Sequence, residues 1–167
     1  MLYNTTSDLM SIIRVLNHIG ELSETDKSYQ NISEFLLYFD NIPFNHSVPV
    51  LVKIGKASRK ISDRIIKKYQ RVPWETIKDF ANIFDMDHEL FGKTALLDLI
   101  KDELPRIEDL LEKIVAKELN EKYFSFKEYK SLSLGKSFAY VNFKLINAHL
   151  LQLKISEIIY ETLWQRS

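Results

Sequence analysis

Apolar residues recur every three or four positions along most of this chain, which is the spacing of helices that bury one face. We expect the first helix to start at Ser7, whose hydroxyl can cap free backbone N–H groups, and to end near Gly20. The polar stretch over residues 21–31 then predicts a loop. The apolar positions of this helix are Leu9, Ile12, Ile13, Leu16 and Ile19.

A short helix is predicted from Ser33, followed by a break that contains Pro43 and then by a long basic helix. Ser47 can cap the long helix, and Pro49 fits an early helical position, where a missing N–H leaves no hydrogen bond unmade. We expect this helix to reach about Tyr69. Its apolar stripe is Ile54, Ala57, Ile61 and Ile65.

Two further helices are predicted in the middle of the chain. Pro73 stops the basic helix and opens the next one, whose apolar positions run from Trp74 to Phe84. The following helix is expected from about residue 94 to about residue 123, with a kink or interruption at Pro105.

The last part of the chain is predicted to be an irregular segment followed by one long helix. Residues 124–135 form the irregular segment, and the helix is expected to start at Lys136 or Ser137 and to end near Trp164. This helix is apolar on two sides, and such helices are usually covered on two sides. We expect one side to pack into the core and the other against a second subunit.

These patterns predict an all-α fold, an up-and-down helical bundle formed by a single domain over residues 1–167. Apolar residues make up 46% of the chain and charged residues 28%, as is ordinary for a globular protein. The absence of cysteine excludes a disulfide framework and thiolate metal sites, and fits a cytoplasmic protein. The first residues do not read as a signal peptide. Lys144 and Lys154 interrupt the apolar run of the last helix, so no membrane span is expected.

The formal net charge is zero, so only the distribution of charge can point to a partner. One side of the predicted basic helix concentrates positive charge, which could neutralise nucleic-acid phosphates or meet an acidic partner. An ordinary solvated face, balanced by acids elsewhere, is the alternative. No aromatic residues alternate along this face, so base stacking on it is unsupported. Its cations are Lys53, Lys56, Arg59, Lys60, Arg64, Lys67 and Lys68, with Arg71 just beyond.

His88 is the histidine with the most suggestive surroundings, because residues 85–89 place three carboxylates beside it. Such a set could bind a divalent cation, but consecutive residues on a helix splay apart, so we predict no metal site. His149, in the apolar last helix, is expected to be a hydrogen-bonded core residue. Nucleotide-binding glycine loops and zinc-protease motifs are absent, and no cofactor is expected.

Four short segments occur in a fixed order along the chain. They are Ile54-Gly55-Lys56-Ala57, Val72-Pro73-Trp74-Glu75, residues 80–92 and Asp102-Glu103-Leu104-Pro105. Their order and spacing resemble the HepT-like family of HEPN domains, in which an Ile-Gly-Glu-Ala segment lies in a long helix, Pro-Trp opens the next helix, a catalytic motif follows, and a later helix contains Asp-Leu-Pro. The resemblance covers roughly residues 7–114 and leaves residues 124–167 as a C-terminal extension.

The resemblance implies a site built on an arginine followed, after four to six residues, by a histidine, often with an asparagine directly after the arginine. Active members are dimeric, metal-independent ribonucleases. The arginine can hold the scissile phosphate, and the histidine can move protons near neutral pH. In this sequence Asn82 matches the asparagine and His88 the histidine, but Ala81 stands at the arginine position. Loss of such a charge-stabilising group typically lowers the rate on the order of a hundred- to a thousandfold.

Two other positions depart from the family pattern. Lys56 replaces the glutamate of the first segment, and Leu90 replaces a tyrosine that a partner nucleotidyltransferase can modify. The leading hypothesis is therefore a degenerate, homodimeric family member that binds a partner protein or a nucleic acid such as RNA, without catalysis. The alternative is a toxin ribonuclease of a HEPN/nucleotidyltransferase toxin–antitoxin pair, in which Arg59 or Arg64 fills the vacant place. A third hypothesis is a helical scaffold with no nucleic-acid role.

Overall fold

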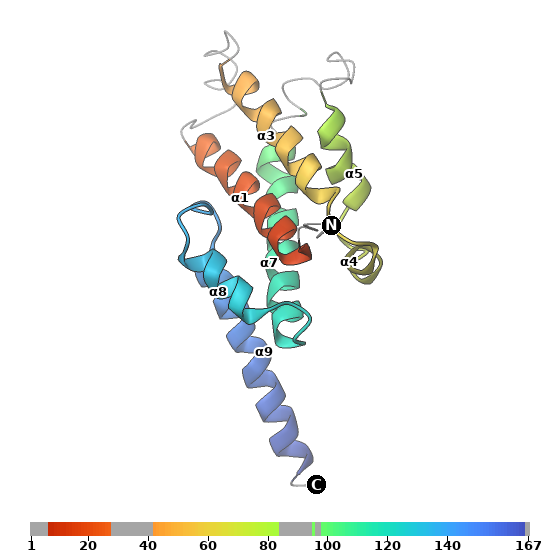
Figure 1. Ribbon diagram of the computed structural model, residues 1–167, viewed down its shortest axis with the longest axis vertical. Helices are drawn as coiled ribbons and strands as arrows, with labels where there is room; N and C mark the ends of the chain where they lie inside the picture. The colour runs from red at the N-terminus through yellow and green to blue at the C-terminus, as the bar shows by residue number, and fades with distance from the viewer. Residues whose placement is uncertain (1–6, 28–41, 84–94, 96–97, 166–167) are drawn as a thin grey trace, which may run out of the picture.

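The computed structural model describes residues 7–27, 42–83, 95 and 98–165, and every regular element in these ranges is a helix (Figure 1). The predicted all-α fold is confirmed for this part of the chain. Two short turns lie between α5 and α7: a 3-10 turn, η1 (Phe80–Asn82), and a π-helical turn, η2 (Leu99–Glu103). The α-helices are α1 (Asp8–Lys27), α3 (Ile42–Ser58), α4 (Asp63–Lys68), α5 (Trp74–Asp79), α7 (Leu104–Asn120), α8 (Phe126–Leu134) and α9 (Phe143–Trp164).

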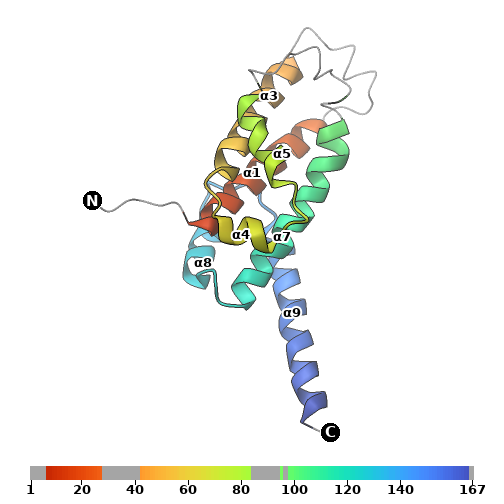
Figure 2. The same ribbon diagram turned by 90° about the vertical axis from the view of Figure 1, so that its right-hand side faces the viewer.

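Helices α1, α3 and α7 form the centre of the bundle. Helix α1 packs along α3 and also against α7, while α5 and η1 lie on α3, and α9 lies on α7 (Figures 1 and 2). The core between them is aliphatic: Ile13, Leu51, Ile77 and Leu111 are completely shielded from solvent. The stripes predicted for the first helix and for the basic helix are buried, as the three-and-four spacing required.

Helix α1 starts where the sequence predicted and ends later. The Ser7 hydroxyl accepts a hydrogen bond from the Met10 N–H at 3.0 Å, which confirms the cap. The predicted end near Gly20 is wrong, because the helix continues to Lys27 and Leu22 is buried in the core. Gly20 has a different role: a Cβ there would lie 2.3 Å from the Tyr140 carbonyl oxygen, so the missing side chain lets a loop reach α1.

The single long helix predicted from Ser47 to about Tyr69 is wrong, because the chain forms α3, a turn over residues 59–62, and α4. Asp8 accounts for the break. Its carboxylate accepts hydrogen bonds from the Ser62 backbone N–H at 2.7 Å and from the Ser62 hydroxyl at 2.6 Å. Asp8 of α1 thus accepts the hydrogen bond of a backbone N–H group at the start of α4. A contact between two distant segments of this kind leaves no local pattern in the sequence.

Both prolines of interest lie inside helical structure. Helix α3 begins at Ile42, so Pro49 is an interior residue rather than an early one, and the prediction for it is wrong. Pro105 stands in the first turn of α7, directly after the π-helical turn η2. Because proline cannot donate to the helical ladder, a change of helix type at this point is its expected consequence. The predicted interruption at Pro105 is therefore confirmed.

The segment predicted to be irregular, residues 124–135, contains α8, and that prediction is wrong. The Ser125 hydroxyl accepts a hydrogen bond from the Glu128 N–H at 3.2 Å, and Tyr129 is buried. Serine followed three residues later by glutamate is a helix-start signal that the sequence interpretation overlooked. Glu128 also accepts a hydrogen bond from the Ser7 hydroxyl, which ties α8 to the start of α1.

The last helix begins later than predicted. Helix α9 starts at Phe143, where the Asn142 side chain accepts a hydrogen bond from the Leu145 N–H at 3.1 Å. Before it, the Tyr140 N–H donates to the Asn17 side-chain oxygen at 3.2 Å, so residues just before α9 fold back onto α1. The short helix predicted from Ser33 lies outside the described residues.

We expect Gly20→Ala to destabilise the protein. Alanine normally stabilises a helix interior by about 1 kcal/mol relative to glycine. At this position the new methyl group meets backbone atoms of Tyr140, and overpacking of that kind costs about 1–3 kcal/mol. Chemical denaturation should show a net loss of up to about 2 kcal/mol.

Gly135→Ala is the matched control, because the nearest atoms to a Cβ at Gly135 lie at 3.6 and 3.7 Å, an ordinary contact distance. The control should change the free energy of unfolding little. An equal effect of the two substitutions would contradict the close approach of α1 and the Tyr140 loop.

Candidate nucleic-acid interface

The described part of the degenerate motif lies on η1, against α3. Ala81 is half-buried and Asn82 is exposed, while His88 lies outside the described residues. A Cβ on Gly55 would lie 2.1 Å from the Ala81 backbone nitrogen, so the backbones of α3 and η1 are in direct contact. The resemblance quotes both Gly55 and Ala81, and the fold brings them together. Whether His88 joins them stays a prediction.

The seven predicted nucleic-acid-binding cations lie on two helices and the turn between them, and they divide into two groups. All seven are exposed, but within the described part of the chain five of them have no carboxylate at ion-pair distance. The other two, Arg64 and Lys68, contact a buried carboxylate. The five without such a contact, called here the free cations, are Lys53, Lys56, Arg59, Lys60 and Lys67.

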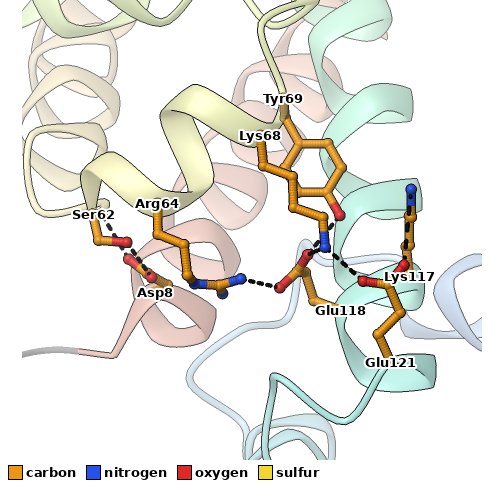
Figure 3. Close-up of polar contacts among 8 residues, drawn as sticks. All are labelled: Asp8, Ser62, Arg64, Lys68, Tyr69, Lys117, Glu118 and Glu121. Carbon is orange, nitrogen blue, oxygen red and sulfur yellow. Dashed lines mark hydrogen bonds and ion pairs between the residues drawn. The ribbon is translucent and has the colours of Figure 1, made fainter.

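Arg64 and Lys68 both reach from α4 to Glu118 on α7, whose side chain has no solvent exposure (Figure 3). Lys68 Nζ lies 2.7 Å from Oε1 of Glu118, and the Tyr69 hydroxyl donates to the same oxygen at 2.6 Å. Arg64 Nη1 lies 2.9 Å from Oε2, as an ion pair without good hydrogen-bond alignment. Three side chains of one short segment therefore converge on one carboxylate.

The backbone of Glu118 is also occupied, because it ends helix α7. Its carbonyl oxygen accepts hydrogen bonds from the N–H groups of Tyr123 at 2.9 Å and Phe124 at 3.0 Å. Lys122, directly before Tyr123, lies in the left-handed region, with φ of 63°, a conformation that glycine usually supplies at helix ends. The turn places the Tyr123 ring under Arg64 and Lys68, with centroid distances of 5.0 and 4.9 Å.

These contacts shift the pKa values of the groups involved. Burial alone would raise the pKa of Glu118, but hydrogen bonds from Lys68 and Tyr69 and the Arg64 charge bring it below its ordinary value. The hydrogen bonds to Glu118 and Glu121 raise the pKa of Lys68. Burial, together with the bond to Glu118, raises the pKa of Tyr69. Glu118 and Lys68 therefore stay ionised, and Tyr69 stays protonated, throughout the neutral range.

A second buried carboxylate on α7, Glu112, has the opposite environment. Among the described residues no hydrogen-bond or ion-pair partner contacts it, and it is 3% exposed. Burial, with the nearby charges of Glu108 and Asp109, raises the pKa of Glu112 to about 7. The same helix thus carries one carboxylate stabilised by three donors and one that burial destabilises when ionised.

A cavity of about 350 Å³ opens beside the Glu118 cluster, between the end of α4 and α7. Its lining is mostly apolar, and the charged side chains that line it are all cations among the residues that the structure describes. The lining residues are Lys67, Lys68, Tyr69, Gln70, Arg71, Val72, Leu110, Lys113, Ile114 and Lys117. Cavities of this size and make-up commonly hold small molecules or single groups of a larger ligand.

A second cavity, of about 400 Å³, lies between α7 and α9 and shares Lys113 and Lys117 with the first. His149 lines it together with Gln152. The prediction that His149 is a hydrogen-bonded core residue is wrong, because the side chain is half-buried and its Nε2 atom is shielded without a hydrogen-bond partner. Lys113 and Lys117 therefore stand between the two cavities, and each also contacts a carboxylate on its own side of the helix: Lys113 lies 2.7 Å from Asp109 and Lys117 lies 3.9 Å from Glu121.

The other two described histidines, His18 and His46, lie on either side of Glu21, toward the C-terminal end of α1. His18 Nδ1 lies 3.3 Å from Glu21, and His46 Nε2 lies 3.9 Å from the same carboxylate. Burial lowers the pKa of His18, and the charges of Lys53 and Arg14 act in the same direction. No group of three or more His, Cys, Asp or Glu side chains in the described ranges is arranged to hold a metal ion.

Sequence reasoning missed Glu118, Lys113 and Lys117. Their signal was weak, because one acid in an otherwise apolar helical stripe and two lysines four residues apart are common on helices. The run from residue 115 to residue 119 places Glu118 between buried Val115 and Leu119, which is the pattern of a buried charge. Such a position indicates that the fold must supply donors.

No protein-family model, curated protein or solved structure matches this chain. The similarity to the HepT-like family therefore stays a prediction. In the described part of the chain, no helix combines the length and the apolar character that crossing a membrane requires.

We expect Glu118→Gln to lower the free energy of unfolding by about 1–3 kcal/mol at pH 7. Breaking a buried ion pair costs about 3–5 kcal/mol, and the partial exposure of Arg64 and Lys68 reduces that figure because both can turn to water. Glu121→Gln, which removes the more exposed partner of Lys68, should cost less than about 1 kcal/mol.

The effect of Glu118→Gln should depend on pH. Because the pKa of Glu118 is lowered in the folded state, its contribution is fully present above the ordinary glutamate pKa and is lost as the pH falls through the lowered value. Denaturation curves of the wild type and the variant should therefore converge in acid. A difference that is no larger than that of Glu121→Gln would contradict the central role of Glu118.

We expect Glu112→Gln to stabilise the protein at pH 8. With a raised pKa in the folded state, ionised Glu112 opposes folding above about pH 7, and this penalty disappears as the pH falls toward the ordinary glutamate pKa. The gain at pH 8 should be on the order of 1–3 kcal/mol, and it should vanish at pH 4. Urea denaturation at both pH values measures it; a variant less stable than the wild type at pH 8 would refute the interpretation.

Proposed function

We propose that this chain is a degenerate HepT-like HEPN protein that binds single-stranded nucleic acid and does not cleave it. The observation that carries the proposal is the free state of the five exposed cations, Lys53, Lys56, Arg59, Lys60 and Lys67. In a chain whose formal net charge is zero, cations without acidic neighbours create a local positive potential that attracts phosphates.

The positions of these cations suit a flexible strand. Lys53 and Lys56 lie three residues apart and therefore share one side of α3, and Lys60 lies in the turn after the end of this helix. Arg59 lies in the following turn, and Lys67 lies near the end of α4. Each phosphate contact releases counterions, which makes the affinity strongly dependent on salt.

The cavity between α4 and α7 supplies apolar surface for a base or a ribose, which a row of lysines lacks. Lys67 is both a free cation and a lining residue of this cavity, whose lining includes Tyr69 and Val72. Three other lining cations, Lys68, Lys113 and Lys117, contact carboxylates. The apolar lining beside Lys67 suits a base or a ribose whose phosphate Lys67 holds at the edge. This arrangement favours single strands over a duplex, in which bases are already stacked.

The ribonuclease alternative gains no support among the described residues. Arg64, one of the two arginines that could fill the place left by Ala81, is held against Glu118. Arg59 is exposed on the turn after α3 and makes no ion pair in the described part of the chain. An acidic partner protein would use the same free cations and is the outcome if nucleic acid does not bind.

We expect the triple variant Lys56→Glu, Lys60→Glu and Lys67→Glu to weaken binding to a single-stranded RNA oligonucleotide and to flatten its salt dependence. Loss of three phosphate contacts should lower the slope of log affinity against log salt by about 2. Fluorescence anisotropy over a salt titration, with EDTA present, measures both quantities.

The matched control is the triple variant Lys127→Glu, Lys130→Glu and Lys136→Glu, which makes the same change in net charge at exposed positions on and after α8. Equal weakening by both triples would show attraction by bulk charge and contradict the proposed surface. Absence of RNA binding by the wild type at low salt would refute the function. Shortened RNA in the EDTA samples that disappears in His88→Ala would establish the ribonuclease instead.

A further inference from the structure

Helix α9 extends beyond the rest of the bundle (Figures 1 and 2). Its first half packs on α7, where Ile146 and Leu150 are buried. Helix α7 ends at Asn120, and the Asn120 side chain donates to Glu157 at 2.6 Å near the end of this contact. From residue 154 to residue 165 every residue of the chain is exposed.

The exposed part of α9 is apolar where a surface helix should be polar. Leu151 is 59% exposed, Ile155 47%, Ile158 63% and Ile159 54%. Contiguous apolar surface of this kind marks an interaction site. A helix that leaves the bundle also loses the packing that supplies most helical stability in water, so its end needs a partner.

The exposed apolar residues form a regular seam on the side opposite the core contact. The core contact uses Phe143, Ile146, Leu150 and Leu153, which repeat at three- and four-residue intervals. The opposite side carries a second stripe with the same alternating intervals, the spacing of the a and d positions of a coiled coil. This stripe, called here the α9 seam, consists of Ala148, Leu151, Ile155, Ile158 and Thr162.

We propose that the α9 seam pairs in an antiparallel direction with the α9 seam of a second copy of this chain. The inference is independent of the proposed nucleic-acid function. It concerns the C-terminal extension, which lies outside the family resemblance.

The two charged residues beside the seam fix the direction of pairing. Lys154 and Glu161 occupy equivalent flanking positions one heptad apart. When Ile155 of one copy lies opposite Ile158 of the partner subunit, an antiparallel arrangement brings Lys154 across from Glu161 of the partner subunit, and symmetry repeats the pair. In a parallel arrangement Lys154 lies across from the apolar Ile159 of the partner subunit, and no ion pair forms.

The seam supplies part of the area of a dimer interface. Each of Leu151, Ile155, Ile158 and Ile159 exposes on the order of 100 Å² of surface, so the four together supply about half of the roughly 800 Å² per partner that stable interfaces bury. The flanking side chains of α9 must supply the rest of the contact. The same pairing places Ile159 of the partner subunit opposite Gln152, which lines the cavity between α7 and α9. The second copy would therefore form part of the wall of that cavity.

The full chain should be a dimer in sedimentation velocity and light scattering over a wide range of concentrations. Ile155→Lys with Ile158→Lys should weaken the dimer by at least tenfold, because buried like charges oppose association. Tyr160→Lys is the matched control: Tyr160 is 64% exposed on the same helix but outside the seam, and its substitution should leave the dimer intact. Circular dichroism verifies that each variant is folded.

Charge reversal tests the direction without altering the apolar seam. Lys154→Glu and Glu161→Lys should each weaken the dimer, and the double variant should restore it. A wild-type chain that is monomeric at all concentrations would overturn the proposal. A dimer that Ile155→Lys with Ile158→Lys leaves intact would also overturn it. A dimer that needs the seam but is not restored by the double charge reversal would overturn the antiparallel direction.

Discussion

The position of the basic helix α4 depends on the contacts that Arg64, Lys68 and Tyr69 make with the buried carboxylate of Glu118. Because it has no contact with solvent, it requires donors from the protein, and Arg64, Lys68 and Tyr69 supply them from one short segment. This requirement fixes α4 against the end of α7. The backbone carbonyl of the same residue ends α7, so the turn toward α8 depends on the same point.

Glu118 also separates the cations that stabilise the fold from those that the proposed function uses. Without it, Arg64 and Lys68 would extend the row of free cations on α3 and the following turn, as the sequence suggested. With it, they stabilise the fold, while Lys67 stays available beside a cavity that contains no acid. Glu112 shows the contrast on the same helix, because a buried carboxylate without donors opposes folding when it is ionised.

Helix α9 presents the same distinction for apolar residues. Its two apolar sides are equivalent in the sequence, yet one is buried on α7 and the other is exposed. Burial of the first side holds α9 against α7. Exposure of the second side leaves apolar surface in contact with water, which is unfavourable unless a partner covers it. The proposed pairing with a second copy would cover this side, would bring Lys154 across from Glu161 of the partner subunit, and would complete the wall of the cavity between α7 and α9.

The amino-acid sequence by itself determined the all-α fold, the cap at Ser7, the buried stripe of the basic helix and the change at Pro105, because these follow from local spacing and backbone chemistry. Tertiary structure alone decided the break before α4, which depends on Asp8, and the role of Gly20, which depends on Tyr140. It also decided which cations are free, since only folding brings Glu118 to Arg64 and Lys68. Contacts between residues far apart in the chain leave no periodic signal, and for that reason the sequence could place the cations but could not assign their partners.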